Sequence, residues 1–247
     1  MTRTDHIALT YQLEFDSAFH CGSGLARGLI HRAIVRDGAG YLHIPGSTIK
    51  GVLRENCEQI AQVCGLSVRD PHDETEALKL FSDSPNIVER IFGSRYQESP
   101  LFFDNAVMTD ESKGFFDSPS QKQKYMFMQT ETRIQTRVSR RTRTVKQGAL
   151  YTSEFGAQFL LFKGKIHGCL TGIPNELSEL PGTYPLFLLI AGIRMTDRIG
   201  ANRSTGMGRC RFSVQKLQVN GTQENKPLKY CEELESLVYY EIAREDQ

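Results

Sequence analysis

The chain has 247 residues, of which 39% are hydrophobic, and it carries 30 Lys and Arg residues against 29 Asp and Glu. This composition supports a folded core and excludes wholesale disorder. The formal charge of +1 gives no global attraction to a polyanion. However, residues 20–54, 131–146 and 194–211 carry net charges of +4, +5 and +4, which leaves −12 for the rest of the chain. Such concentrated positive charge predicts an anionic partner that follows a defined path across the protein.

The cysteine, histidine and hydropathy patterns exclude several classes of protein. The six cysteines form no CxxC pair, and the six histidines show no spacing typical of metal ligands. The N-terminus lacks a charged-then-apolar signal, and no apolar run approaches the ~20 residues of a membrane span. We therefore expect a reduced, cytoplasmic protein with no metal site and no membrane contact.

The beginning of the chain predicts two strands followed by a helix. Residues 6–15 alternate apolar and polar side chains, which is typical of a half-buried strand. A second strand is expected at 29–36, after a glycine-rich stretch. Apolar positions then recur with helical spacing over 49–63, and we expect Ser47 or Thr48 to cap this helix.

Three segments predict surface elements rather than core. The acidic residues 66–93 are expected to form a solvated helical insertion, with short helices near 74–81 and 85–92. The polar residues 109–123 predict a loop. The C-terminal tail, residues 224–247, carries seven acids against three bases and predicts a surface helix.

The remaining segments complete the predicted fold. Residues 130–151 alternate polar, β-branched and arginine side chains without an apolar face, which favours a projecting β-hairpin. Further apolar elements are expected as strands at 101–107, 157–167 and 209–219 and as a helix at 184–195. Strand, helix, strand, occurring twice, predicts a single α+β domain over residues 1–247. The order is that of a ferredoxin-like or RNA-recognition-motif-like (RRM-like) sandwich.

The first candidate site is the start of the helix at Gly46, Ser47 and Thr48. Unpaired backbone N–H groups at a helix N-terminus favour an anion, and Lys50 and Arg54 lie one turn apart beside them. No Gly-Lys-Ser/Thr sequence occurs, so a nucleotide P-loop is not expected. A capped helix with two solvated cations explains this motif equally well.

The second candidate site is the predicted hairpin. Its arginines are Arg133, Arg137, Arg140, Arg141 and Arg143. Arginine forms paired hydrogen bonds with phosphates and stacks on bases, and so many arginines would repel one another without an anion among them. We therefore favour RNA binding over a merely solvated hairpin.

The third candidate site is the glycine-rich segment that contains Arg203, Ser204, Gly206, Gly208 and Arg209. Glycines let backbone amides approach a phosphate, and the Ser and Arg side chains add donors. A plain turn is an equally good explanation of this segment alone.

Four segments together resemble the RAMP superfamily, and within it the backbone subunit of type III CRISPR effector complexes. The segments with this resemblance are IPGSTIKGVLRE at 44–55, LFFDNA at 101–106, TETRIQTRVSRRTRTVKQGALYTSE at 130–154 and GANRSTGMGRCRF at 200–212. They cover nearly the whole chain in the family's order.

The resemblance implies a modified RRM palm with insertions and a β-hairpin thumb at 130–151. It implies that Ser47, Lys50, Arg54 and the loop at 206–209 hold the phosphates of CRISPR RNA. The implied function is a scaffold that displays the guide for pairing with target RNA in antiviral defence. Its implied partners are CRISPR RNA, target RNA and other effector subunits, and RNA binding itself would need no cofactor.

The resemblance leaves catalysis open. Target-cleaving relatives carry an aspartate at the position of His31, six residues before the one that corresponds to Asp37. This change favours a scaffold that does not cleave, with His31 and Asp37 as the catalytic candidates if it does. The alternative is a RAMP endoribonuclease that cuts target RNA or processes CRISPR RNA. It would use Mg²⁺ or Mn²⁺, or else His20 or His31 as general base with Lys50 or an arginine stabilising the charge of the phosphorane.

Overall fold

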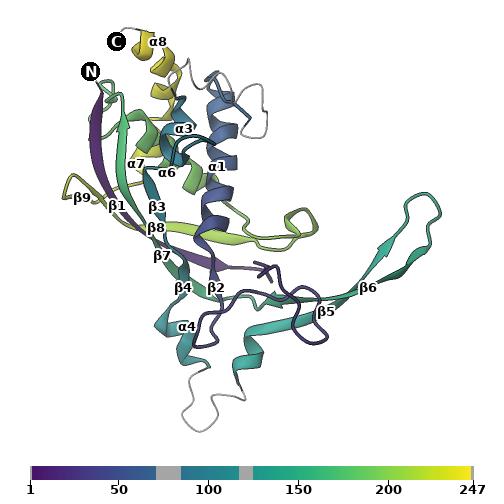
Figure 1. The fold of residues 1–247 in the computed structure, drawn as a ribbon. Coiled ribbons are helices and arrows are strands. Elements are labelled where there is room, and N and C mark those ends of the chain that lie inside the picture. Colours follow the sequence, from purple (N-terminus) through teal and green to yellow (C-terminus); the bar gives the residue numbers. More distant parts are fainter. Residues whose placement is uncertain (1, 71–84, 117–124, 246–247) are drawn as a thin grey trace.

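An antiparallel sheet, helices against one of its faces and a projecting hairpin make up the protein (Figure 1). The structure is a computed structural model that describes residues 2–70, 85–116 and 125–245. The strands of the main sheet are β1 (Arg3–Phe15), β2 (His43–Ile44), β3 (Leu101–Phe103), β4 (Ala106–Met108), β7 (Leu161–Gly172), β8 (Cys210–Val219) and β9 (Thr222–Glu224). Their order is β2-β4-β7-β1-β8-β9, with β3 also paired to β7. This is an α+β protein, as predicted.

The helices cover one face of the sheet (Figure 1). The two longest are α1 (Gly46–Val63) and α6 (Tyr184–Met195), which pack against each other. Helix α6 is buried over Tyr184–Ile193 because nearly all of its side chains are apolar. The predicted helix at 184–195 is confirmed, and the predicted strand at 209–219 is confirmed as β8.

Strand β1 shows why the other face of the sheet stays open. Its alternate side chains from Ile7 to Phe15 are buried in the core, as the sequence alternation predicted. The side chains between them, such as Ala8 and Gln12, point to the opposite face and stay exposed or half-buried.

The hairpin forms a separate two-stranded sheet of β5 (Thr130–Val138) and β6 (Val145–Gly156). The main sheet and its helices form a body that we call the palm, and Figure 1 shows the hairpin projecting far from it. The expected strand at 157–167 begins later, at Leu161, because Ala157–Leu160 form a turn in which Phe159 has a φ of 65°.

The predicted strand at 29–36 is wrong. This segment makes only isolated bridges, including Arg32 with Ser153 and Arg36 with Leu42. Gly24 and Gly28 adopt positive φ angles just before it, so the chain turns there. Its backbone groups instead bond to the base of the hairpin, as described below.

The expectation of a solvated insertion at 66–93 is wrong for its last helix. Helix α3 (Ile87–Phe92) is buried almost throughout, and Asn86 and Glu89 form a capping box at its start. Arg69 neutralises Glu89 at 3.1 Å, which allows this acid to be buried. The expected helix at 74–81 lies outside the described residues.

Two further expectations need correction. The expected loop at 109–123 begins with helix α4 (Asp110–Gly114), and its residues 117–123 lie outside the described part. The tail forms α7 (Lys229–Glu232), a 3₁₀ helix (Leu234–Tyr239) and α8 (Tyr240–Glu245) instead of one surface helix. The tail packs on the core through the fully buried Tyr230, Leu237 and Tyr240. Among the described residues, no helix is long and apolar enough to cross a membrane.

Candidate nucleic-acid interface

The start of helix α1 is held against the sheet by backbone contacts. Pro45 is the N-cap residue, so the expectation that Ser47 or Thr48 caps the helix is wrong. The Gly46 N–H donates to Asn105 Oδ1 at 2.8 Å, and a Cβ at Gly46 would collide with the Phe103 carbonyl oxygen. Gly46 is therefore buried, because the helix packs closely against the Phe103 backbone there. Ser47 is exposed and Thr48 is half-buried.

The two cations on this helix have different environments. Arg54 binds Glu58 at 2.8 Å and the Gly93 carbonyl at 3.1 Å, and its side chain is only 20% exposed. It is therefore not the exposed phosphate ligand that the sequence suggested. Lys50 lies 5.9 Å from the centre of the Phe103 ring, and burial, followed by the nearby Arg54 charge, lowers the pKa of its ammonium group. Lys50 makes no hydrogen bond or ion pair with the residues that the structure describes, so its ammonium group remains available to an anion.

The glycine-rich loop, residues 197–209, is fixed by its own backbone. Cβ atoms would collide with the Ile199 carbonyl at Gly208 and with the His20 carbonyl at Gly200. The backbone N–H groups of residues 206–209 all donate within the protein; Gly208, for example, donates to the Ala18 carbonyl at 2.8 Å. These amides are therefore occupied, contrary to the expectation that they face a phosphate. Side chains are what the loop offers to an anion.

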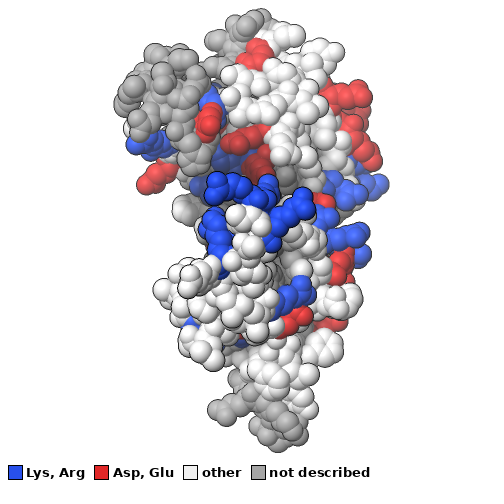
Figure 2. Space-filling model, turned by 90° about the vertical axis from the view of Figure 1, so that its right-hand side faces the viewer, with Lys and Arg blue, Asp and Glu red and all other residues white. Residues whose placement is uncertain are grey.

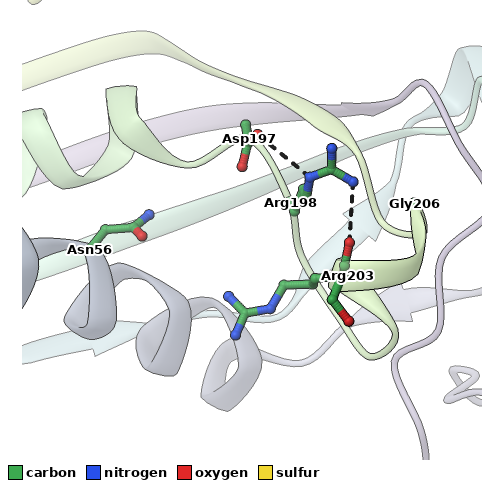
Figure 3. A pocket seen from close by; sticks show the side chains of 6 residues that line it. Asn56, Asp197, Arg198, Arg203 and Gly206 are labelled. Atoms are coloured by element: carbon green, nitrogen blue, oxygen red, sulfur yellow. Dashed lines mark hydrogen bonds and ion pairs between the residues drawn. The ribbon is translucent and has the colours of Figure 1, made fainter.

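The loop side chains border a polar hollow beside helix α1 (Figure 3). Its volume is about 560 Å³, and its lining includes Asn56, Arg198, Arg203 and Ser204. Arg203 binds Glu55 of helix α1 at 2.9 Å, and Arg198 donates to the Arg203 carbonyl at 3.2 Å. The loop is thereby held beside the helix with part of each guanidinium accessible.

A second hollow joins the loop to the hairpin. It has a volume of about 460 Å³ and runs from Gly206 and Met207 to Thr130 and Arg133. Gly206 borders both hollows, so the two hollows lie next to the same loop, one beside helix α1 and the other at the base of the hairpin. Arg209 lies on another side of the loop, where it is 67% exposed and 3.9 Å from Asp16.

The two faces of the hairpin differ along its lower part: one carries Arg133, and the other carries exposed apolar side chains. Arg133 and Gln135 pair across the strands with Ser153 and Tyr151, whereas Ile134 and Thr136 pair with Thr152 and Leu150 on the other side. Ile134 and Leu150 are 70% and 62% exposed, so the expectation of a hairpin without any apolar face is wrong.

Most hairpin arginines are unpaired. Arg133 pairs with Glu131 and lies 5.3 Å from the centre of the Phe155 ring. The others, Arg137, Arg140, Arg141 and Arg143, are exposed and make no side-chain hydrogen bond or ion pair with any residue that the structure describes. Figure 2 shows Lys and Arg side chains gathered across the middle of the face toward which the hairpin projects.

A buried carboxylate anchors the hairpin to the palm. Glu154 Oε1 accepts hydrogen bonds from Arg36 at 2.6 Å and Thr130 at 2.9 Å, and Oε2 accepts the Ile34 N–H at 3.1 Å. Burial raises the pKa of Glu154, but these hydrogen bonds and the Arg36 charge outweigh it and hold the pKa below its usual value. His20 contacts the Glu154 carbonyl at 2.6 Å, and burial lowers the pKa of His20. Local sequence patterns do not reveal this anchor, because Ile34 and Arg36 precede Glu154 by 120 and 118 residues.

The catalytic candidates lie beside this anchor but are occupied by structural hydrogen bonds. Asp37 Oδ1 accepts the N–H groups of Ala39 and Tyr41, both at 2.9 Å, in a tight turn. His31 is exposed, and its Nδ1 accepts the Thr152 N–H at 3.1 Å. A neutral His31 in this arrangement carries its proton on Nε2, which leaves no free nitrogen lone pair for a general base.

These residues do not fit the Mg²⁺ or Mn²⁺ site that target cleavage in the family implies. Hard cations need several converging oxygen ligands. In the described ranges, no group of three His, Cys, Asp or Glu residues is placed to hold a metal ion. We therefore derive no metal-dependent step for this chain.

Comparison with known proteins identifies the family. The model of the RAMP superfamily matches residues 12–211. The chain belongs to the RAMP superfamily. Comparison of this RAMP protein with curated sequences gives no match.

Solved structures agree with the RAMP fold. A cryo-EM structure of the type III-B Cmr-beta complex bound to cognate target RNA contains a similar chain, with 12% identity and a TM-score of 0.54. The similarity covers 84% of this RAMP protein and 96% of that chain. The apo state of Cmr-beta gives 12% identity and a TM-score of 0.52, over 84% and 97% of the two chains. At this identity the likeness shows a shared fold.

Proposed function

We propose that this RAMP protein is a CRISPR RNA-binding scaffold subunit of a type III effector ribonucleoprotein. It displays the guide for pairing with target RNA in antiviral defence, and it assembles with other effector subunits. The palm is then a modified RRM: the order β8-β1-β7 followed by β3 and β4 is that of a ferredoxin-like sheet.

The observation that carries the proposal is the row of four unpaired arginines on a projecting hairpin. Side chains that carry charge without a partner among the described residues fit a function in which an anion supplies the partner. The hairpin joins the palm beside one polar hollow, and the same loop borders a second hollow that Arg203 and Ser204 line next to helix α1. An extended, anionic single strand matches this path better than a compact ligand does.

RNA cleavage is the second candidate function, and the position of His31 at the base of the hairpin favours it. The imidazole is exposed beside the basic path. However, its Nδ1 is held by the Thr152 N–H, so it is a hydrogen-bond donor rather than a base. We therefore propose that the chain holds RNA without cutting it.

Fluorescence anisotropy with a labelled single-stranded RNA tests the proposal. Contacts from Lys50 and the four unpaired hairpin arginines would contribute about −3.5 to the slope of log affinity against log salt, since each phosphate contributes about −0.7. Double-stranded RNA of the same length is the control, and we expect it to bind more weakly. A slope near zero would refute RNA binding by this path.

A further inference from the structure

The open face of the palm sheet carries regular rows of polar and basic side chains. In one row, Lys165 of β7 lies opposite Thr10 of β1, which lies opposite Lys216 of β8. In the next row, Lys163 lies opposite Gln12. The three lysines are exposed. Helices α1 and α6 pack on the other face, so this surface is separate from the interface described above (Figure 1).

The lysines of this face are not neutralised within the described residues. No hydrogen bond or ion pair there engages the ammonium groups of Lys163, Lys165 or Lys216. The nearby acids have other partners: Glu14 binds Arg211 at 3.3 Å, and Asp104 lies 3.9 Å from His167. The sheet face therefore has an excess of positive charge, which fits an anionic partner.

An exposed aromatic ring lies beside these lysines. Phe102 of β3 is 64% exposed, and its ring stacks on His167 with 5.5 Å between ring centres and 28° between planes. His167 follows Lys165 by two residues on the same face of β7, a separation of about 6.8 Å along the strand. Stacked rings next to cations form the surface on which single-stranded nucleic acids bind, with a base on the ring and phosphates on the cations.

We propose that the open face of the palm sheet is a second RNA-binding surface, which stacks a base on Phe102 and binds the flanking phosphates through Lys163, Lys165 and Lys216. The inference extends the proposed function, because it adds a contact to single-stranded RNA on the opposite side of the palm. Between the lysines lie Thr10 and Gln12, whose uncharged donors and acceptors suit bases. An acidic protein would use the lysines but not the exposed ring pair.

Two variants with different signatures test this surface in salt titrations with labelled single-stranded RNA. Lys163→Ala/Lys165→Ala removes two phosphate contacts, so the salt slope becomes shallower by about 1.4 and affinity falls about tenfold near physiological salt. Phe102→Ala removes a stacked base, so affinity falls at least about fivefold while the slope stays unchanged. Lys226→Ala/Lys229→Ala, which removes the same charge from the tail, is the matched control and should bind as wild type.

Crosslinking gives a second readout that does not depend on affinity. RNA containing 4-thiouridine should crosslink to the peptide that contains Phe102, and less so in the Lys163→Ala/Lys165→Ala variant. If wild-type protein shows no salt-dependent RNA binding, both the inference and the proposed function fail. If it binds RNA and the sheet variants match the control, this inference alone fails. Sheet variants that bind RNA normally but no longer join effector subunits would overturn it in favour of a protein partner.

Discussion

Removal of the hairpin arginines should weaken RNA binding without affecting the fold. The variant replaces the four unpaired arginines with glutamine: Arg137, Arg140, Arg141 and Arg143. Since these side chains are exposed and have no described partner, the free energy of unfolding should change by less than about 0.5 kcal/mol. Each lost phosphate contact makes the salt slope shallower by about 0.7, so four make it shallower by about 2.8. At a salt concentration of about 0.15 M this corresponds to a roughly 200-fold loss of affinity.

The assay is fluorescence anisotropy across a salt series, with thermal unfolding measured in parallel. The matched control is Ile134→Ser/Leu150→Ser, which changes two exposed apolar side chains of the same hairpin and no charge. We expect this control to keep the wild-type slope. The reasoning is refuted if the arginine variant keeps the wild-type slope, or if the control loses as much affinity as the arginine variant.

Three further predictions concern the anchor, helix α1 and catalysis. Glu154→Gln should lower the free energy of unfolding by about 3 kcal/mol, because it removes the buried negative charge that balances the half-buried Arg36 guanidinium. The pKa of Glu154 is lowered on folding, so its contribution is complete above the unfolded value of about 4.3 and is lost as the pH falls through the folded value. Denaturant titrations of both proteins should therefore converge in acid, and a constant difference down to low pH would contradict this account. Arg54→Ala should lower the free energy of unfolding by about 1–2 kcal/mol, because it removes two hydrogen bonds. Lys50→Ala should weaken RNA binding, measured by anisotropy, at an unchanged free energy of unfolding. An unstable Lys50→Ala beside a fully stable Arg54→Ala would be inconsistent with the contacts of Arg54. Target RNA incubated with wild-type protein or with His31→Ala should stay intact on sequencing gels. Metal-dependent cuts that disappear with Asp37→Ala would instead show an active ribonuclease.

Local periodicity was enough to predict much of the fold. The alternation of β1 and the apolar run of α6 each determine which residues are buried, so both elements were found. The arginine pattern also indicated the hairpin. These features depend on neighbours in sequence, for which the physical rules are strong.

Contacts between distant residues account for what the sequence did not reveal. The segment at 29–36 was expected to be a strand, but its backbone bonds to Thr152 and the Glu154 side chain, which local pattern does not reveal. The sequence predicts an exposed Arg54, but its guanidinium donates hydrogen bonds to Glu58 and to the Gly93 carbonyl. The pairing with Glu58 could have been found, because charges four residues apart on a helix are neighbours.

The basic open face was also present as a local signal. Lys163, Lys165 and His167 alternate with buried residues along a predicted strand, so their common face could be inferred. What the sequence could not show is that Phe102 of another strand lies beside His167 and that Lys216 lies two strands away.

The RNA that accompanies the protein in cells tests the central claim most directly. The tagged chain is purified with its complex, and the bound RNA is extracted and sequenced. Our account predicts RNAs from CRISPR arrays that share a repeat-derived end and carry different spacers. A population that mirrors the general cellular RNA, or no RNA at all, would contradict it.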